Sequence, residues 1–209
     1  MTYRPPYFRV DDPAKLLALI AAHPLATVVT AHDGDLSLTY APLLARTEGE
    51  TVLLQGHIAR ANDHWRHDAS AAVAIFKIAE HYISPTWYPS KRADPRTVPT
   101  YDYVAVEARG PIRFIHDEAW LAGFTRRLTE SQEPRVHGTW SVDDAPADYL
   151  KSQLQAIVGL EMRLESLTGT FKLHQNHPKE NIESVIASLE ALGTARAAEI
   201  ASFMKEANC

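Results

Sequence analysis

The segment Gly56–Asn62 combines a small residue, a cation and polar side chains directly after a strand-like run. The run before it, Thr51–Gln55, is apolar, and the residues after it, Asp63–His67, suit a short helix. Backbone N–H groups at a helix N-terminus attract phosphate, and the guanidinium of Arg60 can make a two-pronged contact with phosphate oxygens. The pattern therefore indicates an anion cradle. The alternative is an ordinary strand-to-helix turn that carries a surface arginine.

Aromatic side chains are concentrated in the segment His81–Tyr88, and Thr100–Tyr103 adds two more rings. Trp and Tyr each offer a flat apolar body with one polar tip. A cluster of them in a loop suits a planar ligand or a partner surface. The alternative is a loop that aromatic anchors hold against the core.

A third polar cluster lies at Lys172–His177. Lys172 can hold a phosphate, and the side-chain amides of Gln175 and Asn176 can bind the carbonyl and N–H groups of a heterocycle. The alternative is a solvated strand end that polar residues cap.

The histidines do not form a metal motif. His64 and His67 would share a helix face, and His57 is close in sequence, but a third ligand at the spacing of a zinc site is missing. We therefore predict no metal site. No nucleophile elbow, P-loop, paired catalytic carboxylate motif or CxxC is found, so catalytic residues stay unassigned, with His57, His81 and His174 as the available acid–base groups.

The composition is that of an ordinary globular protein, 45% hydrophobic and 22% charged. The net charge of −5 argues against broad nucleic-acid binding, which needs a basic face. Cys209 is the single cysteine, so no intrachain disulfide can form and nothing indicates an oxidising compartment. No apolar run suits a signal peptide or a membrane span. We expect a cytoplasmic protein with no membrane contact.

The first half of the chain predicts a helix and then an antiparallel meander. Asp12 and Pro13 open the helix, and Pro24 ends it. Hairpin turns are expected at residues 33–35 and 48–50. The three strands of the meander are expected at residues 25–32, 36–45 and 51–55.

The second half alternates strands and helices. Strands are expected at residues 71–78, 101–115, 158–164 and 171–176, the first buried on both faces and the third half-buried. A turn is expected at residues 168–169. An ordered loop or lid is expected at residues 81–100. Helices are expected at residues 117–131, 147–156 and 179–207, the last with a break at 193–194.

Together these elements predict a mainly β fold of the α+β class, an antiparallel β-barrel decorated by helices. The chain has no G-x-G-x-x-G and no βαβ alternation, which excludes a Rossmann sheet. We expect a barrel domain over residues 1–178 and a C-terminal helical extension over 179–209.

Three segments in fixed order resemble one family, the PaiB-type FMN-binding negative transcriptional regulators. They are Gly56–Asn62 with Trp65, then Tyr82–Tyr88 with Val98–Val106, and then Lys172–Asn176. The start of the chain at Tyr3–Phe8 and the strand Ala41–Leu44 also fit. The resemblance covers nearly the whole chain, from about Tyr3 to His177.

The resemblance implies an FMN-binding split β-barrel and a homodimer with flavin in a groove between subunits. It places the phosphate end of FMN near the first segment and the rest of the cofactor near the other two. The cofactor-binding residues that it implies are His57, Ile58, Ala59, Arg60, Ala61, Asn62, Tyr82, Ser84, Trp87, Tyr103, Lys172, Gln175 and Asn176.

This chain departs from the family at two places. The family commonly shows Thr-Trp-Asn-Tyr where this chain has Thr100–Tyr103, and Leu-Ser-Gln-Asn where it has Leu173–Asn176. The first departure introduces the carboxylate of Asp102. That charge would repel an anionic reduced flavin if the two lay close together.

Several functions stay open at this point. An FMN-binding split-barrel protein can be a flavin-dependent oxidoreductase, in which the cofactor carries the redox chemistry, or a flavin-linked negative transcriptional regulator. The alternatives are a regulator without flavin and a haem-binding split-barrel protein. DNA contact is supported only by the basic residues Lys91, Arg92 and Arg96, without a helix-turn-helix.

Overall fold

The computed structural model describes the backbone of residues 3–208, so Cys209 lies outside the described residues. The chain divides into two compact units. Unit 1 comprises residues 1–19, 77–106 and 168–209, and unit 2 comprises residues 20–76 and 107–167. No helix among the described residues is long and apolar enough to cross a membrane.

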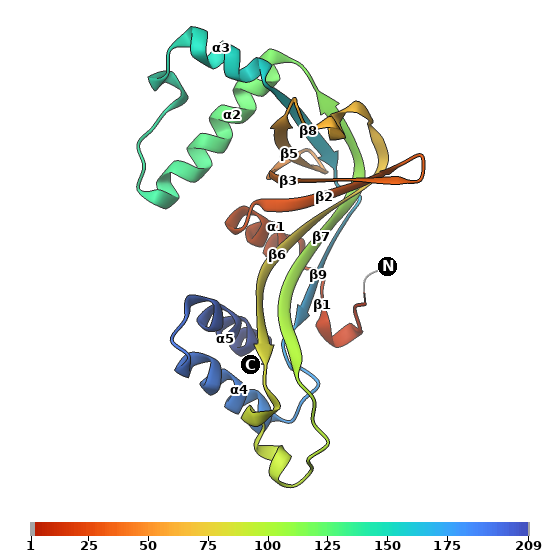
Figure 1. The fold of residues 1–209 in the computed structure, drawn as a ribbon, viewed down its shortest axis with the longest axis vertical. Helices are drawn as coiled ribbons and strands as arrows, with labels where there is room; N and C mark the ends of the chain where they lie inside the picture. The colour runs from red at the N-terminus through yellow and green to blue at the C-terminus, as the bar shows by residue number, and fades with distance from the viewer. Residues whose placement is uncertain (1–2, 209) are drawn as a thin grey trace. The chain divides into compact units, whose positions relative to one another are not determined.

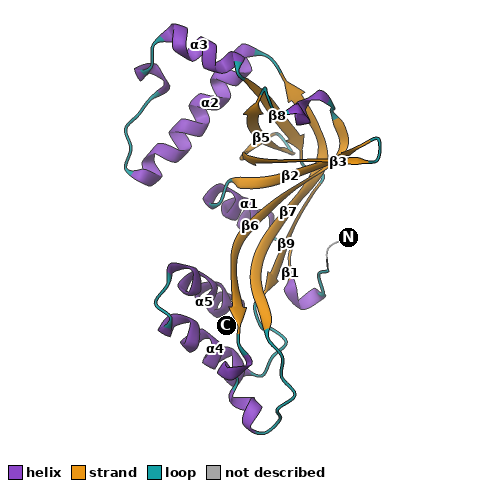
Figure 2. Ribbon diagram, viewed as in Figure 1, coloured by secondary structure: helices purple, strands orange, loops and turns teal. Residues whose placement is uncertain are grey.

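A nine-stranded sheet forms the framework, with the strand order β3-β2-β6-β7-β8-β5-β4. In addition, β9 pairs with β7 and β1 pairs with β9. The ladders β1–β9, β2–β3, β2–β6, β4–β5, β5–β8 and β7–β8 are antiparallel. Figure 2 shows these strands in orange. Over the described residues the ladder ends at β3 and β4, so the sheet is not closed. The predicted antiparallel split β-barrel with helices is confirmed.

Within residues 3–208, nine strands make up this sheet. The strands are β1 (Arg9–Val10), β2 (Leu25–His32), β3 (Asp35–Pro42), β4 (Leu44–Glu48), β5 (Thr51–Ala59), β6 (Ala69–Ile83), β7 (Thr100–Ile115), β8 (Ile157–Arg163) and β9 (Ser166–Lys172). The longest two, β6 and β7, contribute residues to both units.

The first hairpin forms as predicted. Asp33 and Gly34 both have positive φ, 50° and 89°. Two such residues make the tight turn whose twist matches the flanking strands, and His32 then pairs with Asp35.

The expected strand over residues 36–45 is wrong because the chain breaks at Leu43. The Leu43 side chain is fully buried, and its N–H donates to the carbonyl of Pro24 at 2.8 Å. As a result β3 pairs with β2, while β4 pairs with β5. The expected three-strand meander is therefore two separate hairpins.

The segment Gly56–Asn62 is mostly strand. β5 continues to Ala59, which pairs with Ile157 of β8. Only Arg60–Asn62 turn, and a single 3-10 turn at Asp63–Arg66 follows, with the Asn62 side chain accepting from the His64 N–H at 3.1 Å. The expected strand end at residue 55, before a cradle, is thus wrong by four residues.

Two strands show how burial follows alternation. In β7, Asp102, Val104 and Val106 are buried and the residues between them are not. In β6, Phe76 is fully buried but Ile75 is 38% exposed, so the expected burial on both faces is wrong.

The strands β8 and β9 also differ from expectation. Gly159 and Glu161 are buried on the face of β8 predicted to be exposed. The ring of Trp120 lies over Gly159, and Glu161 binds other side chains. The turn expected at residues 168–169 is wrong, because Gly169 lies within β9 and pairs with Val10.

Five helices complete the fold, and their positions agree with the sequence predictions. They are α1 (Pro13–Ala22), α2 (Glu118–Gln132), α3 (Ala147–Gln155), α4 (Lys179–Ala191) and α5 (Ala195–Ala207). The Asp117 carboxylate caps α2 by accepting from the Trp120 N–H at 2.6 Å. In unit 1, α4 and α5 lie side by side (Figure 1) and bury Val185, Leu189 and Ile200. The expected domain boundary at residue 178 stays a prediction.

The predicted loop over residues 81–100 is mostly irregular. β6 continues into it as far as Ile83, and two 3-10 turns follow at Pro85–Trp87 and Pro89–Arg92.

Candidate functional sites

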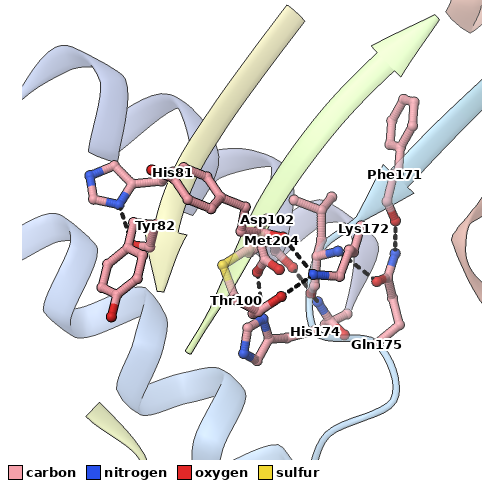
Figure 3. A network of polar contacts seen from close by, with 12 residues as sticks. His81, Tyr82, Thr100, Asp102, Phe171, Lys172, His174, Gln175 and Met204 are labelled. Carbon is pink, nitrogen blue, oxygen red and sulfur yellow. Dashed lines mark hydrogen bonds and ion pairs between the residues drawn. The ribbon is translucent and has the colours of Figure 1, made fainter. Parts of the chain in front are cut away.

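Three buried side chains of unit 1 form a hydrogen-bonded chain. The Oδ2 atom of Asp102 lies 2.5 Å from Nδ1 of His174, as Figure 3 shows. The Nε2 atom of His174 lies 2.8 Å from the hydroxyl of Tyr88. Their exposed fractions are 0%, 2% and 4% for Asp102, His174 and Tyr88. Asp102 comes from the inward face of β7, and His174 follows β9 in a left-handed conformation with φ 65°.

The protons in this chain follow from the partners. A carboxylate only accepts, so Nδ1 of His174 carries the proton and donates to Asp102. Nε2 of His174 then accepts from the Tyr88 hydroxyl. Burial, followed by the charge of Asp102 and by Tyr82, raises the pKa of Tyr88 to about 12. Tyr88 therefore keeps its proton at neutral pH.

A cavity of about 590 Å³ in unit 1 is lined by this chain. Its volume is within the range of small-molecule sites. Asp102 Oδ1 and Thr97 Oγ1 are buried without a hydrogen-bond partner among the described residues, and both residues line the cavity. Buried polar atoms normally have partners, so these two atoms make the cavity a candidate site for a ligand or for water.

Lys172 lies at the edge of the same cavity. Its Nζ donates to the hydroxyl of Thr100 and, at 2.6 Å, to the carbonyl of Tyr101 (Figure 3). Burial lowers the pKa of Lys172, and the charge of Asp102 opposes that shift. The cavity thus contains a cation close to a buried carboxylate.

The Gln175 side chain has a structural role in the turn after β9. Its Oε1 accepts from the Leu173 N–H at 2.8 Å, and its Nε2 donates to the Phe171 carbonyl at 2.6 Å (Figure 3). These bonds hold the turn that presents His174. Of the predicted residues in this unit, Lys172 and Asn176 line the cavity.

The aromatic segment of unit 1 is more exposed than a ligand pocket requires. Tyr82 is 45% exposed, and its ring meets the edge of Tyr101 at 5.8 Å. The Trp87 ring lies 6.3 Å from that of His81. Ser84 caps a 3-10 turn by accepting from the Thr86 N–H at 3.3 Å. Tyr103, on the outward face of β7, is only partly buried. Their role as FMN contacts stays a prediction.

In unit 2 the guanidinium of Arg60 binds main-chain carbonyls. It donates to Gln155 at 2.7 Å and to Ile157 at 3.0 Å, and it lies 3.3 Å from Nδ1 of His116. The carbonyl of Arg60 accepts from the Trp65 ring N–H at 2.7 Å. Arg60 therefore ties the end of β5 to the start of β8.

A groove of about 330 Å³ in unit 2 lies beside the predicted phosphate segment. It is lined by Ser37, Leu38, Asn62, Asp63, His64, Arg66 and His67. Nε2 of His64 lies 2.7 Å from the Thr30 hydroxyl, and its Nδ1 is buried without a partner among the described residues. Burial lowers the pKa of His64, so the ring is neutral at pH 7. The Asn62 amide donates to the Thr39 hydroxyl at 2.7 Å.

The other residues of the segment lie apart from this groove. His57 lines a different cavity of about 590 Å³ beside α2 and α3, with its ring 5.7 Å from that of Phe124. Burial lowers the pKa of His57. Ile58 is buried, whereas Ala59 and Ala61 are exposed. The side chains of Gly56–Asn62 therefore do not share one site. Asn62 lines the groove, His57 lines the cavity beside α2 and α3, and Arg60 binds main-chain carbonyls.

The sequence analysis assigned no cofactor role to several residues that line the cavity and the groove, although Tyr88 and His177 lie in segments that it singled out. Tyr88, Thr97 and His177 line the unit 1 cavity, and His64 and Arg66 line the unit 2 groove. Asp102 and His174 had signals, as departures from the family pattern. Tyr88 ends the aromatic run but nothing in the sequence distinguishes it. No group of three or more His, Cys, Asp or Glu in the described part of the chain could hold a metal ion.

Comparison with known proteins settles the family. The family described as "Putative FMN-binding domain" matches residues 2–166. The protease synthase and sporulation protein PAI 2 of Bacillus subtilis is 26% identical over 207 residues, covering 98% of this chain and 97% of the relative. The chain belongs to the PaiB-type FMN-binding family. An uncharacterized protein of Aspergillus fumigatus is 29% identical, covering 73% of this chain and 72% of that one. The family match supports FMN as the cofactor.

Solved structures share the fold. The flavocytochrome Anf3 of Azotobacter vinelandii has a TM-score of 0.57 at 16% identity, covering 81% of this chain and 72% of that chain. An FAD and haem binding protein of Mycobacterium smegmatis has a TM-score of 0.56 at 15% identity, covering 86% and 80%. At these identities the similarity concerns the fold alone.

Proposed function

We propose that this PaiB-family protein is an FMN-dependent redox protein that works as a homodimer. The observation that carries the proposal is the family match over residues 2–166. When bound, FMN supplies hydride and single-electron chemistry, and the protein supplies binding, orientation and electrostatics.

The unit 2 groove suits the phosphate of FMN. The unpartnered Nδ1 of His64 can donate one hydrogen bond, because Nε2 can accept from Thr30. Arg66 pairs with exposed Asp63 at 2.7 Å and lies 5.1 Å from the centre of the Trp65 ring, and such an exposed ion pair can exchange partners. We therefore add His64 and Arg66 to the predicted phosphate residue Asn62. Arg60 keeps its place in the proposal as the residue that holds this end of β5.

An exposed apolar face in unit 2 supports the homodimer. Leu36, Leu38 and Tyr40 project from one face of β3 and are 74%, 53% and 69% exposed. Leu25 of β2 and Ile75 of β6 are also exposed. Apolar patches of this kind mark interaction surfaces. Leu38 also lines the phosphate groove, so a second copy on this face would lie beside the proposed flavin site.

DNA contact is not part of the proposal. The net charge is −5, and the guanidinium of Arg96 in the basic segment is occupied by the Asp94 carboxylate, 2.8 Å away. A nonspecific DNA contact needs free cations to neutralise phosphates.

The test compares FMN with riboflavin, which lacks the phosphate, by titration of flavin fluorescence. Arg66→Ala is expected to weaken FMN about tenfold, the size of one charge-assisted contact, and riboflavin hardly at all. Arg60→Ala is the matched control at a neighbouring arginine. It should lower the stability of the protein and leave the ratio of FMN affinity to riboflavin affinity nearly unchanged. Equal losses for both flavins with Arg66→Ala would refute the phosphate role of the groove.

A further inference from the structure

The Asp102–His174–Tyr88 chain lines a cavity in unit 1. All three of its residues are buried, and two hydrogen bonds join them. The chain and the cavity lie wholly within unit 1. The proposed phosphate groove lies in unit 2 and shares no lining residue with this cavity.

We propose that the unit 1 cavity binds a small aromatic molecule with an ionisable hydroxyl group, a phenol, and that Tyr88 and His174 remove its proton. The ligand hydroxyl would donate to the oxygen of Tyr88. Tyr88 would pass its own proton to Nε2 of His174, the atom 2.8 Å from its hydroxyl. The O–H bond of the ligand breaks, Tyr88 ends neutral, and no electrons are transferred.

The geometry stabilises the products of that transfer. Protonation makes His174 an imidazolium, and the carboxylate of Asp102 lies 2.5 Å from its Nδ1. An opposite charge at this distance in a buried site favours the charged ring. Asp102 is thus a positioning residue that also compensates the new charge.

Lys172 suits the phenolate that remains. An ammonium has three N–H donors, and the contacts with Thr100 and Tyr101 use two of them. The third can donate to the phenolate oxygen. The other titratable groups that line the cavity are Tyr3, Tyr7, Asp94, Arg96 and His177. Of these, Arg96 and Asp94 neutralise each other, and the ring of His177 lies 4.3 Å from that of His174.

The aromatic side chains and the unpartnered polar atoms that line the cavity also suit a phenol. Phe8 and Tyr7 line the cavity, with their rings packed edge to face at 4.5 Å, which suits an aromatic ring. The unpartnered Asp102 Oδ1 and Thr97 Oγ1 can each take a hydrogen from a further hydroxyl or a water. A carboxylic acid fits less well, because it is already ionised at neutral pH and has no proton to give.

The probe is 4-nitrophenol, whose phenolate absorbs visible light and whose phenol form does not. The compound is titrated into the purified full-length protein at a pH below the pKa of the free phenol. Difference spectra against ligand-free protein are recorded. The expected result is a saturable phenolate band, which means that the bound ligand is ionised where the free ligand is not.

Variants test whether the phenolate band depends on the Asp102–His174–Tyr88 chain or on nonspecific binding to the protein surface. Tyr88→Phe removes the contact hydroxyl, and His174→Gln removes the proton acceptor while keeping polar atoms. Each is expected to reduce the phenolate band about tenfold. Tyr149→Phe is the matched control, because Tyr149 is 56% exposed and lies outside the lining, and it should leave the band unchanged. Circular dichroism checks that each variant is folded.

Three results would overturn the proposal. One is no binding at millimolar 4-nitrophenol, and another is binding without a phenolate band. The third is a full band in folded Tyr88→Phe. If His174→Gln fails to fold, the comparison of Tyr88→Phe with Tyr149→Phe decides the matter alone.

Discussion

The Oδ2 atom of Asp102 and the Nδ1 atom of His174 lie 2.5 Å apart, and both side chains are buried. Two segments that are 72 residues apart in the sequence therefore meet in one buried carboxylate–imidazole pair.

This contact predicts strong coupling between the two positions. His174→Ser should cost about 3 kcal/mol, because it leaves the carboxylate of Asp102 buried without its donor. Adding Asp102→Asn, which removes the unpartnered buried charge, should recover about 1–3 kcal/mol. Urea unfolding of both single variants and the double variant gives the coupling free energy between the two positions. Additive losses would mean that the pair does not act as a unit.

Stability should fall in acid. Burial lowers the pKa of His57, His64 and His177 from 6.5, so the unfolded chain takes up protons there before the folded protein does. The stabilisation is complete above about pH 6.5 and is lost as the pH falls from that value towards the folded pKa, by at most about 1.4 kcal/mol per pH unit for each group.

Urea unfolding as a function of pH measures this loss. His64→Gln keeps a partner for Thr30 but cannot titrate, so its stability should fall less steeply below pH 6.5. Thr30→Val is the control, since it removes the bond and keeps the titration. If the stability of His64→Gln fell as steeply below pH 6.5 as that of the native protein, His64 would not contribute to the loss of stability in acid.

Gly110 is expected to be intolerant of any side chain. A Cβ there would lie 1.8 Å from the backbone oxygen of Arg163. Gly110→Ala should cost about 3 kcal/mol, because backbone cannot move aside as a side chain can. Gly123→Ala on α2 is the matched control. Its Cβ would meet only the end of Arg127 at 3.4 Å, and alanine gains up to about 1 kcal/mol in a helix. Thermal unfolding of the two variants should shift in opposite directions, and a tolerated Gly110→Ala would contradict the close approach.

The apolar face of β3 predicts a dimer that one charge can break. Leu38→Glu places a carboxylate at the centre of the exposed row Leu36, Leu38 and Tyr40. Sedimentation velocity should show a dimer for the native protein and a monomer for Leu38→Glu. Leu192→Glu, at an apolar residue that is exposed outside this face, should stay dimeric. A native monomer at micromolar concentration would rule out the homodimer.

Local signals predicted many elements well. Asp33 and Gly34 define a tight turn by their own conformations, and Asp117 caps α2 with its own side chain. Such features depend on neighbours in sequence, so the sequence alone contains them.

Long-range contacts account for the errors. The break at Leu43 depends on the carbonyl of Pro24, 19 positions earlier in the numbering. Gly169 stays in a strand because β1 pairs with it, and a Cβ there would lie 2.7 Å from a Leu16 side-chain carbon. Asp102 and His174 are 72 residues apart, so their contact could not be read from spacing. The contacts of Arg60 with the carbonyls of Gln155 and Ile157 span 95 and 97 residues, so they too were absent from the local pattern, and its role as an FMN contact stays a prediction.

The most direct test of the central claim is the flavin content of the purified protein. The absorption spectrum of the native protein, and the flavin released when it is denatured, give the identity and the number of cofactors per chain. We predict about one FMN per chain after incubation with excess FMN and removal of the free flavin. A colourless protein that retains neither FMN nor FAD, and that leaves flavin fluorescence unchanged at micromolar concentration, would contradict it.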